Sequence, residues 1–482
     1  MRPKTPLQSK MPFAIDPRPM DGFVTAQAGG VAFASRAFRS LNLPGVCEAN
    51  LPNLRKIEKG YTPGQMVESL SLACLVGCER VSDLDGLSAD EAVAKMLGYK
   101  MPSSRTARDF LDAFHDPEQI VQAQKRAVER KQKAYIPKAT PLQEGLLRVL
   151  GASARAVATK GSNVEMGTID MDATIIESRK QCANVTYEGT RGFQPMVALW
   201  MEADAIVAVE FRDGNVPARM NPKACAVLAF QQLPKTIKRL AFRGDSANYD
   251  WDLLRWLRDE QRNEGPQGRI EFAISAMMSP ELTSACAKLS DAQWTTFGTT
   301  EEDGTIRQAA EIAFTPTEPS EKSCTQALRF IGLRLLKPKG LTFADGSDRR
   351  FLALVTNSTN PEAAKVIQWH RQKAGTIEHA HDELKNALAA AALPSKRFGA
   401  NAAWLTINAI AYNLASSIRA VVPDPELRTA RLKALRFHLF QVAARVIRDR
   451  RKITIRFAAS PSWMASMQAF CKQFPCRTQA TG

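Results

Sequence analysis

Two aspartates lie inside a run of residues that otherwise predicts a buried β-strand. The run, VEMGTIDMDATII at residues 164–176, is rich in β-branched and large apolar residues, as buried strands are. Strands disfavour aspartate, so Asp170 and Asp172 need a chemical reason to be there. Because they are two positions apart, both side chains point to the same face of the strand. Spacing alone therefore does not choose between them as a functional carboxylate.

The segments after this strand predict a mixed α/β sheet. Two further strand-like segments follow directly, and helical and strand-like segments then alternate up to residue 275. Three consecutive strands followed by alternation are typical of a sheet that begins as a meander and continues with crossover helices. The later strand-like segments are residues 193–201, 205–214, 239–246 and 269–275, and the helical ones are residues 221–233 and 247–262.

Composition divides the rest of the chain, whose 482 residues exceed the usual size of one domain. Residues 1–160 predict an all-α N-terminal region, either a DNA reader of the helix-turn-helix kind or a plain helical bundle. Residues 136–160, rich in Pro, Gly and Ala, mark its boundary. We predict core segments at 161–275 and 350–422, a mainly β insertion at 276–349 and a helical, basic C-terminal region at 423–482.

The charge balance points to a polyanionic partner. The chain has 65 Lys and Arg against 49 Asp and Glu, a net charge of +16, and such a surplus attracts nucleic acid. Residues 428–456 hold ten Lys or Arg and one acid, a density that favours phosphate contact over a merely solvated face. The alternative is a basic protein without a nucleic-acid partner.

Cysteine usage and hydropathy indicate a cytosolic protein. Nine cysteines occur without a CxxC pair, which predicts reduced, buried thiols rather than a disulfide framework. The N-terminal residues lack the apolar stretch of a signal peptide. The uncharged stretch at residues 398–418 contains three asparagines and predicts a buried helix rather than a membrane span.

Two more acids stand where a metal-dependent site needs them. Asp245 ends a predicted strand, where its simpler role would be to cap the next helix. Glu378 falls inside a helical region that runs from residue 361 to about 392. Arg371 and Lys385 lie seven residues before and after Glu378, on the same helical face, although ordinary surface ion pairing would also explain them. His370, His379 and His381 lack a sensibly spaced fourth zinc ligand.

Taken together, these motifs resemble the DDE transposases of bacterial insertion sequences, specifically the insertion-sequence 1380 family. The resemblance covers most of the chain. It rests on Asp172-Ala173-Thr174, on Arg243-Gly244-Asp245-Ser246, on the Glu378 helix with Lys385, on residues 393–404, and on the N-terminal segments at 60–62 and 102–106.

The resemblance implies an RNase H-like mixed sheet in which Asp172, Asp245 and Glu378 bind two Mg²⁺ ions, for which Mn²⁺ can substitute. Carboxylate oxygens are the ligands that such hard cations prefer, and two metals about 4 Å apart can stabilise both oxygens of a phosphodiester displacement. The implied activity is DNA cleavage followed by strand transfer. The mainly β insertion fits the long gap between Asp245 and Glu378.

The implied partners are terminal inverted repeats and target DNA, bound by a homodimer in a synaptic complex in the bacterial cytoplasm, associated with the nucleoid and not with a membrane. Trp369 or Trp404 would stack on a displaced base. Gln368 stands where the broader group has a tyrosine, and the group's arginine position falls on Arg371 or Lys373. The expected DNA contacts are Arg371, Lys373, Lys385, Arg105, Arg108, Arg445, Arg448, Arg451 and Lys452.

Two other functions fit the same residues. A stand-alone nuclease of the same fold would cut DNA without joining it. A catalytically inactive, transposase-derived protein would only bind DNA, although acids at all three positions argue against this alternative.

Overall fold

A nine-stranded mixed sheet forms the centre of the computed structural model, which describes residues 21–54, 60–159, 164–316, 328–449, 452–458 and 461–474. Its first three strands form an antiparallel meander, and the next two run parallel to the first. The predicted meander and alternation are therefore confirmed. These strands are β2 (Met166–Ala173), β6 (Met196–Trp200), β7 (Ala205–Glu210), β8 (Arg239–Gly244) and β9 (Ile270–Ser275).

Both faces of this part of the sheet are covered. Along β6, Val197 and Leu199 join a core shared with the N-terminal helices, whereas Met196, Ala198 and Trp200 join a core on the other face. Two-sided burial explains why β6 is a continuous apolar run rather than an alternating one. Helices α9 (Pro222–Gln231) and α10 (Trp251–Arg258) cover the second face.

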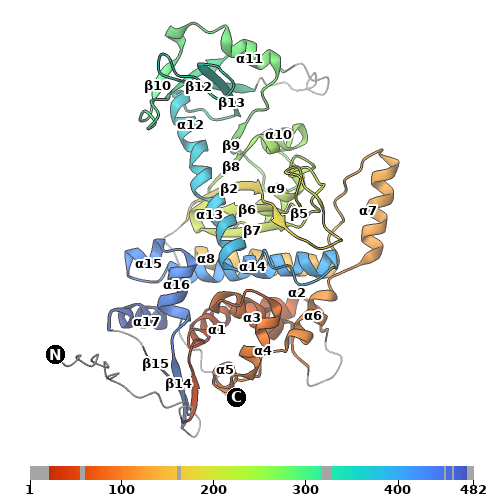
Figure 1. Ribbon diagram of the computed structural model, residues 1–482, viewed down its shortest axis with the longest axis vertical. Coiled ribbons are helices and arrows are strands. Elements are labelled where there is room, and N and C mark those ends of the chain that lie inside the picture. The colour runs from red at the N-terminus through yellow and green to blue at the C-terminus, as the bar shows by residue number, and fades with distance from the viewer. Residues whose placement is uncertain are drawn as a thin grey trace, which may run out of the picture.

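The insertion extends the same sheet. Strand β13 pairs antiparallel with β9, and the remaining strands follow in the order β12, β11 and β10. The predicted β character is correct, but the boundary at 349/350 falls at the start of a strand. In Figure 1 this region forms the upper lobe. Its elements are α11 (Pro280–Ala287), β10 (Thr295–Phe297), β11 (Ile306–Ile312), β12 (Arg329–Leu336) and β13 (Arg349–Thr356).

The N-terminal helices do not form a separate unit. Residues 136–160 were expected to be a domain boundary, yet Thr140 caps an 18-residue helix, α8 (Pro141–Ala158), which packs along α14 (Phe398–Arg419). One core runs through these helices, α14 and the C-terminal region. The other N-terminal helices are α1 (Val31–Ser40), α2 (Leu43–Asn50), α3 (Pro63–Val76), α4 (Leu84–Ala89), α5 (Glu91–Leu97), α6 (Ser104–Asp112) and α7 (Pro117–Glu129).

The C-terminal region is not purely helical, contrary to the prediction. A hairpin of β14 (Ala444–Asp449) and β15 (Lys452–Phe457) pairs with β1 (Phe23–Thr25). Burial alternates at the start of β14, where Ala444 and Val446 are buried and Arg445 is exposed, so these basic residues belong to a strand rather than to a helix. The helices here are α15 (Pro425–Thr429), α16 (Leu432–Leu435) and α17 (Pro461–Gln473).

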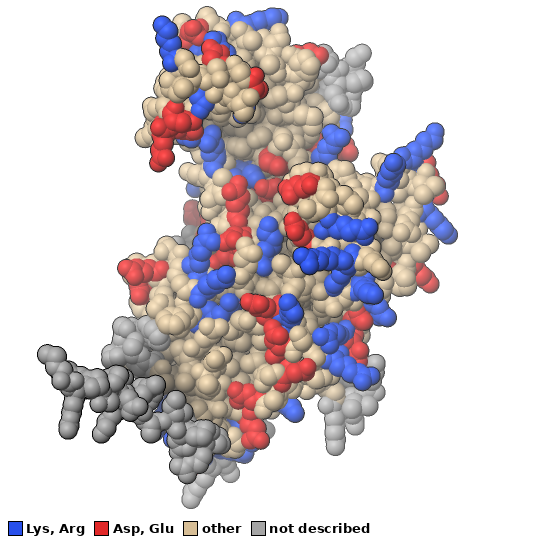
Figure 2. Space-filling view, in the orientation of Figure 1, with Lys and Arg blue, Asp and Glu red and all other residues tan. Residues whose placement is uncertain are grey.

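Among the described residues, no helix is both long and apolar enough to cross a membrane. The predicted buried helix at residues 398–418 is confirmed as α14. The described cysteines are free, but Cys182 and Cys471 are exposed, so the prediction of buried thiols fails for these two. On the face shown in Figure 2, Lys and Arg side chains gather over the middle of the molecule.

Candidate active site

Asp172 and Asp245 lie at the same edge of the sheet. Strands β2 and β8 are parallel, with Met171 opposite Gly244, so the next residue of each strand is one of these aspartates. Burial raises the pKa of the Asp245 carboxyl, and the negative charge of Asp172 raises it further. The register therefore brings together two carboxylates that repel each other.

Asp245 also fulfils the simpler role expected of it. Its carboxylate accepts hydrogen bonds from the Ala247 amide at 3.1 Å and from the Asn248 side chain at 2.9 Å, and so caps a 3₁₀ turn. These bonds fix the carboxylate at the end of β8. His370 adds to this rigidity because its Nε2 donates to the carbonyl of Gly244 at 2.9 Å.

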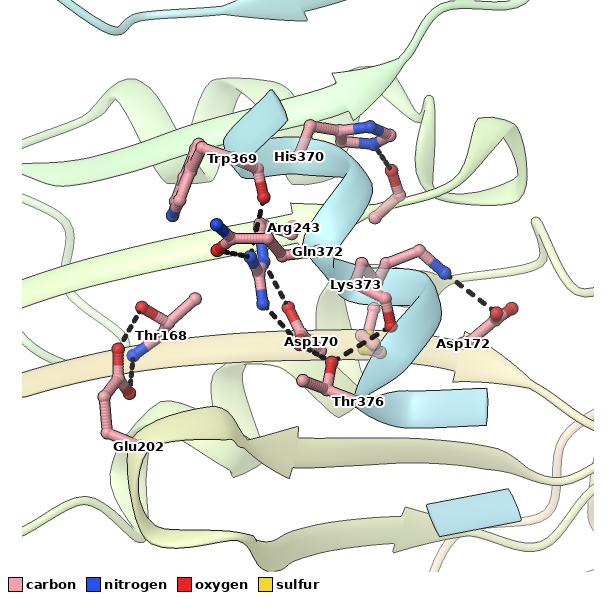
Figure 3. A network of polar contacts seen from close by, with 12 residues as sticks. Thr168, Asp170, Asp172, Glu202, Arg243, Trp369, His370, Gln372, Lys373 and Thr376 are labelled. Carbon is pink, nitrogen blue, oxygen red and sulfur yellow. Dashed lines mark hydrogen bonds and ion pairs between the residues drawn. The ribbon is translucent and has the colours of Figure 1, made fainter. Parts of the chain in front are cut away.

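Asp170 and Asp172 differ sharply in their surroundings. The Asp170 side chain is fully buried and receives two hydrogen bonds from Arg243, at 2.6 and 2.7 Å, and one from the Thr376 hydroxyl. The Asp172 side chain is 20% exposed. Both point toward the segment that joins two helices (Figure 3), as their spacing predicts. Asp170 is committed to an internal ion pair, whereas Asp172 is accessible.

Arg243 connects this strand pair to the helical region. Its guanidinium donates to the Trp369 carbonyl at 2.7 Å and to the Gln372 side chain at 3.3 Å, and lies 5.6 Å from the centre of the Trp369 ring. The indole of Trp369 thus covers a buried cation, as Figure 3 shows. This contact is a structural role for Trp369 that differs from the base stacking expected from the sequence.

Lys373 is the cation nearest the carboxylate pair. Its Nζ lies 2.8 Å from an oxygen of Asp172, and the side chain is only 9% exposed. Arg371 instead lies beside Arg307 and Glu301 of the insertion; burial lowers its pKa, and Arg307 lowers it further. Of the two alternatives left open by the sequence, Lys373 is therefore the one placed at the site.

The expected continuous helix around Glu378 is interrupted twice. Helix α12 (Ala363–Arg371) passes into a 3₁₀ turn (Gln372–Gly375), and α13 (Ile377–Asp382) passes into a π-helical segment (Glu383–Ala387). The prediction that Arg371, Glu378 and Lys385 share one face is wrong, because it assumed a uniform turn of 3.6 residues. Segments of π-helix are frequent at functional sites.

Glu378 is exposed in the first turn of α13, which packs against β2 and β6. Within the described ranges, no group of three or more His, Cys, Asp or Glu side chains is arranged to hold a metal ion. The structure therefore brings together Asp172, Asp245 and Lys373, and does not gather Glu378 with them.

His381 is a neighbour of the pair that sequence reasoning considered only as a zinc ligand. It is 7% exposed, and its Nε2 is buried without a hydrogen-bond partner among the described residues. Burial lowers its pKa to about 4, against the opposing influence of Asp172, and Lys385 and Lys373 lower it as well. Its position one residue after Ala380 and four after Ile377, both buried, is the apolar spacing that could have revealed it as facing the core.

Comparison with known proteins identifies the family. A family model described as "Transposase DDE domain group 1" matches residues 21–475. The chain belongs to this family. Among solved structures, it is similar to a piggyBac transposase in a synaptic complex with hairpin DNA, with 10% sequence identity, a TM-score of 0.40, and coverage of 86% of this chain and 80% of that one. A comparison with curated protein sequences finds no match.

The expected DNA-contacting residues of this transposase occupy different regions. Arg105 and Arg108 are exposed on α6, and Arg445 and Arg448 are exposed on β14. The β14–β15 hairpin lies at the end of the molecule opposite the insertion, away from β2 and β8 (Figure 1). Lys452 begins β15, and Arg451 lies outside the described residues. Arg108 and Lys385 line one common cavity.

Trp404 does not have the stacking role expected from the sequence. Its side chain is 1% exposed in the core of α14, and its indole N–H donates to the Ala389 carbonyl at 3.0 Å. A buried and hydrogen-bonded indole cannot stack on DNA without unpacking the core, so the expected stacking role is wrong for this conformation.

Asp172 and Asp245 fit a divalent cation. Their oxygens are the hard ligands that Mg²⁺ prefers, and burial together with the negative charge of Asp172 raises the pKa of Asp245. The Lys373 ammonium already supplies a positive charge to Asp172. The pair therefore has the donor chemistry of a metal site, while Glu378 stands apart from it.

Proposed function

We propose that this transposase cleaves DNA at the ends of an insertion sequence and joins the freed ends to target DNA. The observation that carries the proposal is the pair of carboxylates, Asp172 and Asp245, at the ends of adjacent parallel strands. The membership in the DDE transposase family supports it. Asp172, Asp245 and Glu378 are proposed as the catalytic carboxylates on an RNase H-like sheet.

The proposed chemistry is two in-line displacements at phosphorus. Water attacks the phosphodiester at the element end, the bond to the 3′ oxygen breaks, and a 3′-hydroxyl is released. That hydroxyl then attacks a target phosphate and displaces the target's own 3′ oxygen, so one phosphodiester bond forms as another breaks. Two Mg²⁺ ions, or Mn²⁺, would supply charge stabilisation for the attacking and leaving oxygens.

The chain's own residues have distinct tasks in this scheme. Asp172 and Asp245 would hold the cations, and Glu378, exposed on α13, is proposed as the third carboxylate of the set. Lys373, whose ammonium pairs with Asp172, would contact a DNA phosphate. The buried pair of Arg243 and Asp170 keeps β2, β8 and the 372–376 segment in register.

The proposal extends to the partners named by the resemblance. These are terminal inverted repeats and target DNA, with a homodimer pairing two ends in a bacterial cell, as in the insertion-sequence 1380 family. The net charge of +16 supports DNA as the partner.

A cleavage assay tests the function. The substrate is a duplex that carries the element end flanking this gene, with Mg²⁺ or Mn²⁺ and with EDTA as the control. We expect Asp172→Asn, Asp245→Asn and Glu378→Gln to retain DNA binding and to lose at least about 100-fold in cleavage rate. Normal cleavage by Glu378→Gln would show that the third carboxylate is another residue.

A second assay separates the alternatives. Pre-cut element ends with a free 3′-hydroxyl are mixed with a supercoiled target plasmid, and joined products are measured. Joining supports a transposase. Cutting without joining would indicate a nuclease, and binding without cutting would indicate an inactive DNA-binding protein.

A further inference from the structure

A small three-stranded sheet stands at the edge that carries Asp172. Its strands are β3 (Ile176–Glu177), β4 (Asn184–Val185) and β5 (Arg191–Phe193), all within the connection from β2 to β6. The Thr174 amide donates to the Pro195 carbonyl at 3.0 Å, so the two arms of this connection leave the main sheet together. Because β2 ends at Ala173 and β3 begins at Ile176, the small sheet begins only a few residues after Asp172.

The turn of this small sheet presents an exposed aromatic side chain. Thr186 and Thr190 close the turn with a backbone hydrogen bond of 2.8 Å, and Tyr187 between them is 76% exposed. Partial burial raises the pKa of Tyr187, and Glu188, Asp172 and Asp245 raise it further. An aromatic ring thus lies in open solvent within electrostatic reach of both carboxylates.

A basic cavity of about 840 Å³ lies beside β3, and Glu177 of this strand is part of its lining. Seven Lys or Arg and two Glu line it, and they come from the N-terminal helices, the small sheet, the π-helical segment and the C-terminal region. We call this the basic cavity; its cationic lining consists of Arg80, Arg108, Arg179, Lys180, Lys385, Lys433 and Arg436.

Two of these cations form hydrogen bonds that connect the segments lining the cavity. Lys180 Nζ donates to the carbonyls of Leu393 and Ser395, at 2.5 and 2.7 Å. Arg436 donates to the carbonyls of Cys74, Leu75 and Ala387. These contacts join the small sheet, α3 and the π-helical segment around one space, so the cavity is built by the fold.

Other cations of the cavity face solvent. Arg80, Arg179 and Lys433 are exposed, and within the part of the chain that the structure describes none of the three forms an ion pair. A cluster of unpaired cations in a hollow concentrates positive potential. Phosphate oxygens are the groups that would neutralise it.

We propose that the basic cavity and Tyr187, which meet on the small sheet that follows Asp172 in the chain, bind a single strand of DNA. Grooves that bind single strands combine cations along the backbone with aromatic rings on which bases stack, and both features occur here on one small sheet. The cavity has the volume of a small-molecule site, which is enough for a few nucleotides of one strand. This inference rests on the proposed function, because it names the part of the DNA substrate that the same site holds.

Binding of single-stranded DNA tests the proposal. The probe is a fluorescent oligonucleotide of about 12 nucleotides, a length within the usual range of single-strand sites. Fluorescence anisotropy gives Kd at several salt concentrations for the full-length wild type and for Arg179→Ala/Lys433→Ala, Tyr187→Ala and Tyr187→Phe. The control is Lys339→Ala, an exposed cation of the insertion lobe.

We expect the cation variant and the tyrosine variant to weaken single-strand binding in different ways. Loss of two phosphate contacts should lower the slope of log Kd against log salt by about 1.4. Tyr187→Ala should weaken binding about tenfold without changing the slope, and Tyr187→Phe should restore it because stacking needs only the ring. If all variants bind the single strand as Lys339→Ala does, the proposal is wrong.

Cleavage of duplex element ends separates this inference from the proposed function. If the wild type cuts and the cavity variants bind single strands normally, the cavity inference fails alone. If the wild type never cuts but single-strand binding depends on Arg179, Lys433 and Tyr187, the cavity inference holds and the catalytic proposal fails. Thermal unfolding of each variant checks the fold, and since all three side chains are exposed we expect no loss of Tm.

Discussion

At the residue scale, two aspartates on one face of β2 have different roles. Asp170 neutralises a fully buried arginine, whereas Asp172 is accessible beside Asp245. Removing one partner of a buried ion pair leaves an uncompensated charge and costs about 3–5 kcal/mol. We therefore expect Asp170→Asn to lower the free energy of unfolding by that amount in urea titrations, and Asp172→Asn to lower it by less, because Asp172 is partly exposed and Lys373 keeps Asp245 as a neighbouring negative charge. Equal stability of the two variants would contradict this division.

Asp245 gives a pH dependence whose sign is opposite to that of an ion-paired aspartate. Its pKa is raised above the ordinary value of 3.8, so folding favours the protonated form. The stabilisation is complete below 3.8 and is lost as pH rises through the raised pKa. At neutral pH the ionised carboxyl therefore costs stability, and Asp245→Asn should unfold at a higher urea concentration than the wild type. The difference should disappear at acid pH, and a variant less stable than wild type at pH 7 would contradict the sign.

At the scale of elements, the π-helical segment is fixed by a buried ion pair. Glu383 and Arg419 side chains are 2% and 6% exposed, with an oxygen-to-nitrogen distance of 2.5 Å, and Glu383 also accepts from the Leu432 amide. Glu383→Gln should destabilise the protein by about 3 kcal/mol and slow cleavage, because Lys385 belongs to the same segment. Glu378→Gln is the control, expected to lose cleavage at wild-type stability. Urea midpoints and cleavage rates would show whether the two effects separate.

The elements also show what the sequence could and could not predict. The strands carrying Asp172 and Asp245, and their meander order, follow from local composition, because two-sided burial leaves continuous apolar runs. The turn at Gln372–Gly375 and the π-helical segment do not follow from local composition. They depend on tertiary contacts such as Lys373 with Asp172 and Glu383 with Arg419. The pairing of β1 with β14 joins segments about 420 residues apart, which no local pattern encodes.

At the scale of the whole molecule, the N-terminal helices and α14 share one core. Nearly every residue of α14 is buried, and α8, α3 and α6 pack against it. A fragment that begins at residue 164 would expose this helix to water. We expect such a fragment to lack cooperative unfolding in urea and to bind a dye specific for exposed apolar surface, unlike the full chain. A cooperative transition in the fragment would mean that the core folds without residues 1–163.

Gly399 lies where the N-terminal helices pack against α14, and adding a single methyl group there tests this packing. A Cβ at this position would lie 2.2 Å from the Phe114 carbonyl oxygen and 2.6 Å from the His115 Cα, so the segment that follows α6 would have to move away from α14. Overpacking of this kind costs about 1–3 kcal/mol, and we expect Gly399→Ala to lower Tm accordingly. Gly375→Ala is the matched control, because nothing lies within 4 Å of its added Cβ and a glycine replaced without strain gains about 0.4–1 kcal/mol. Equal Tm values for the two variants would show that the N-terminal helices are not seated on α14 as closely as this contact requires.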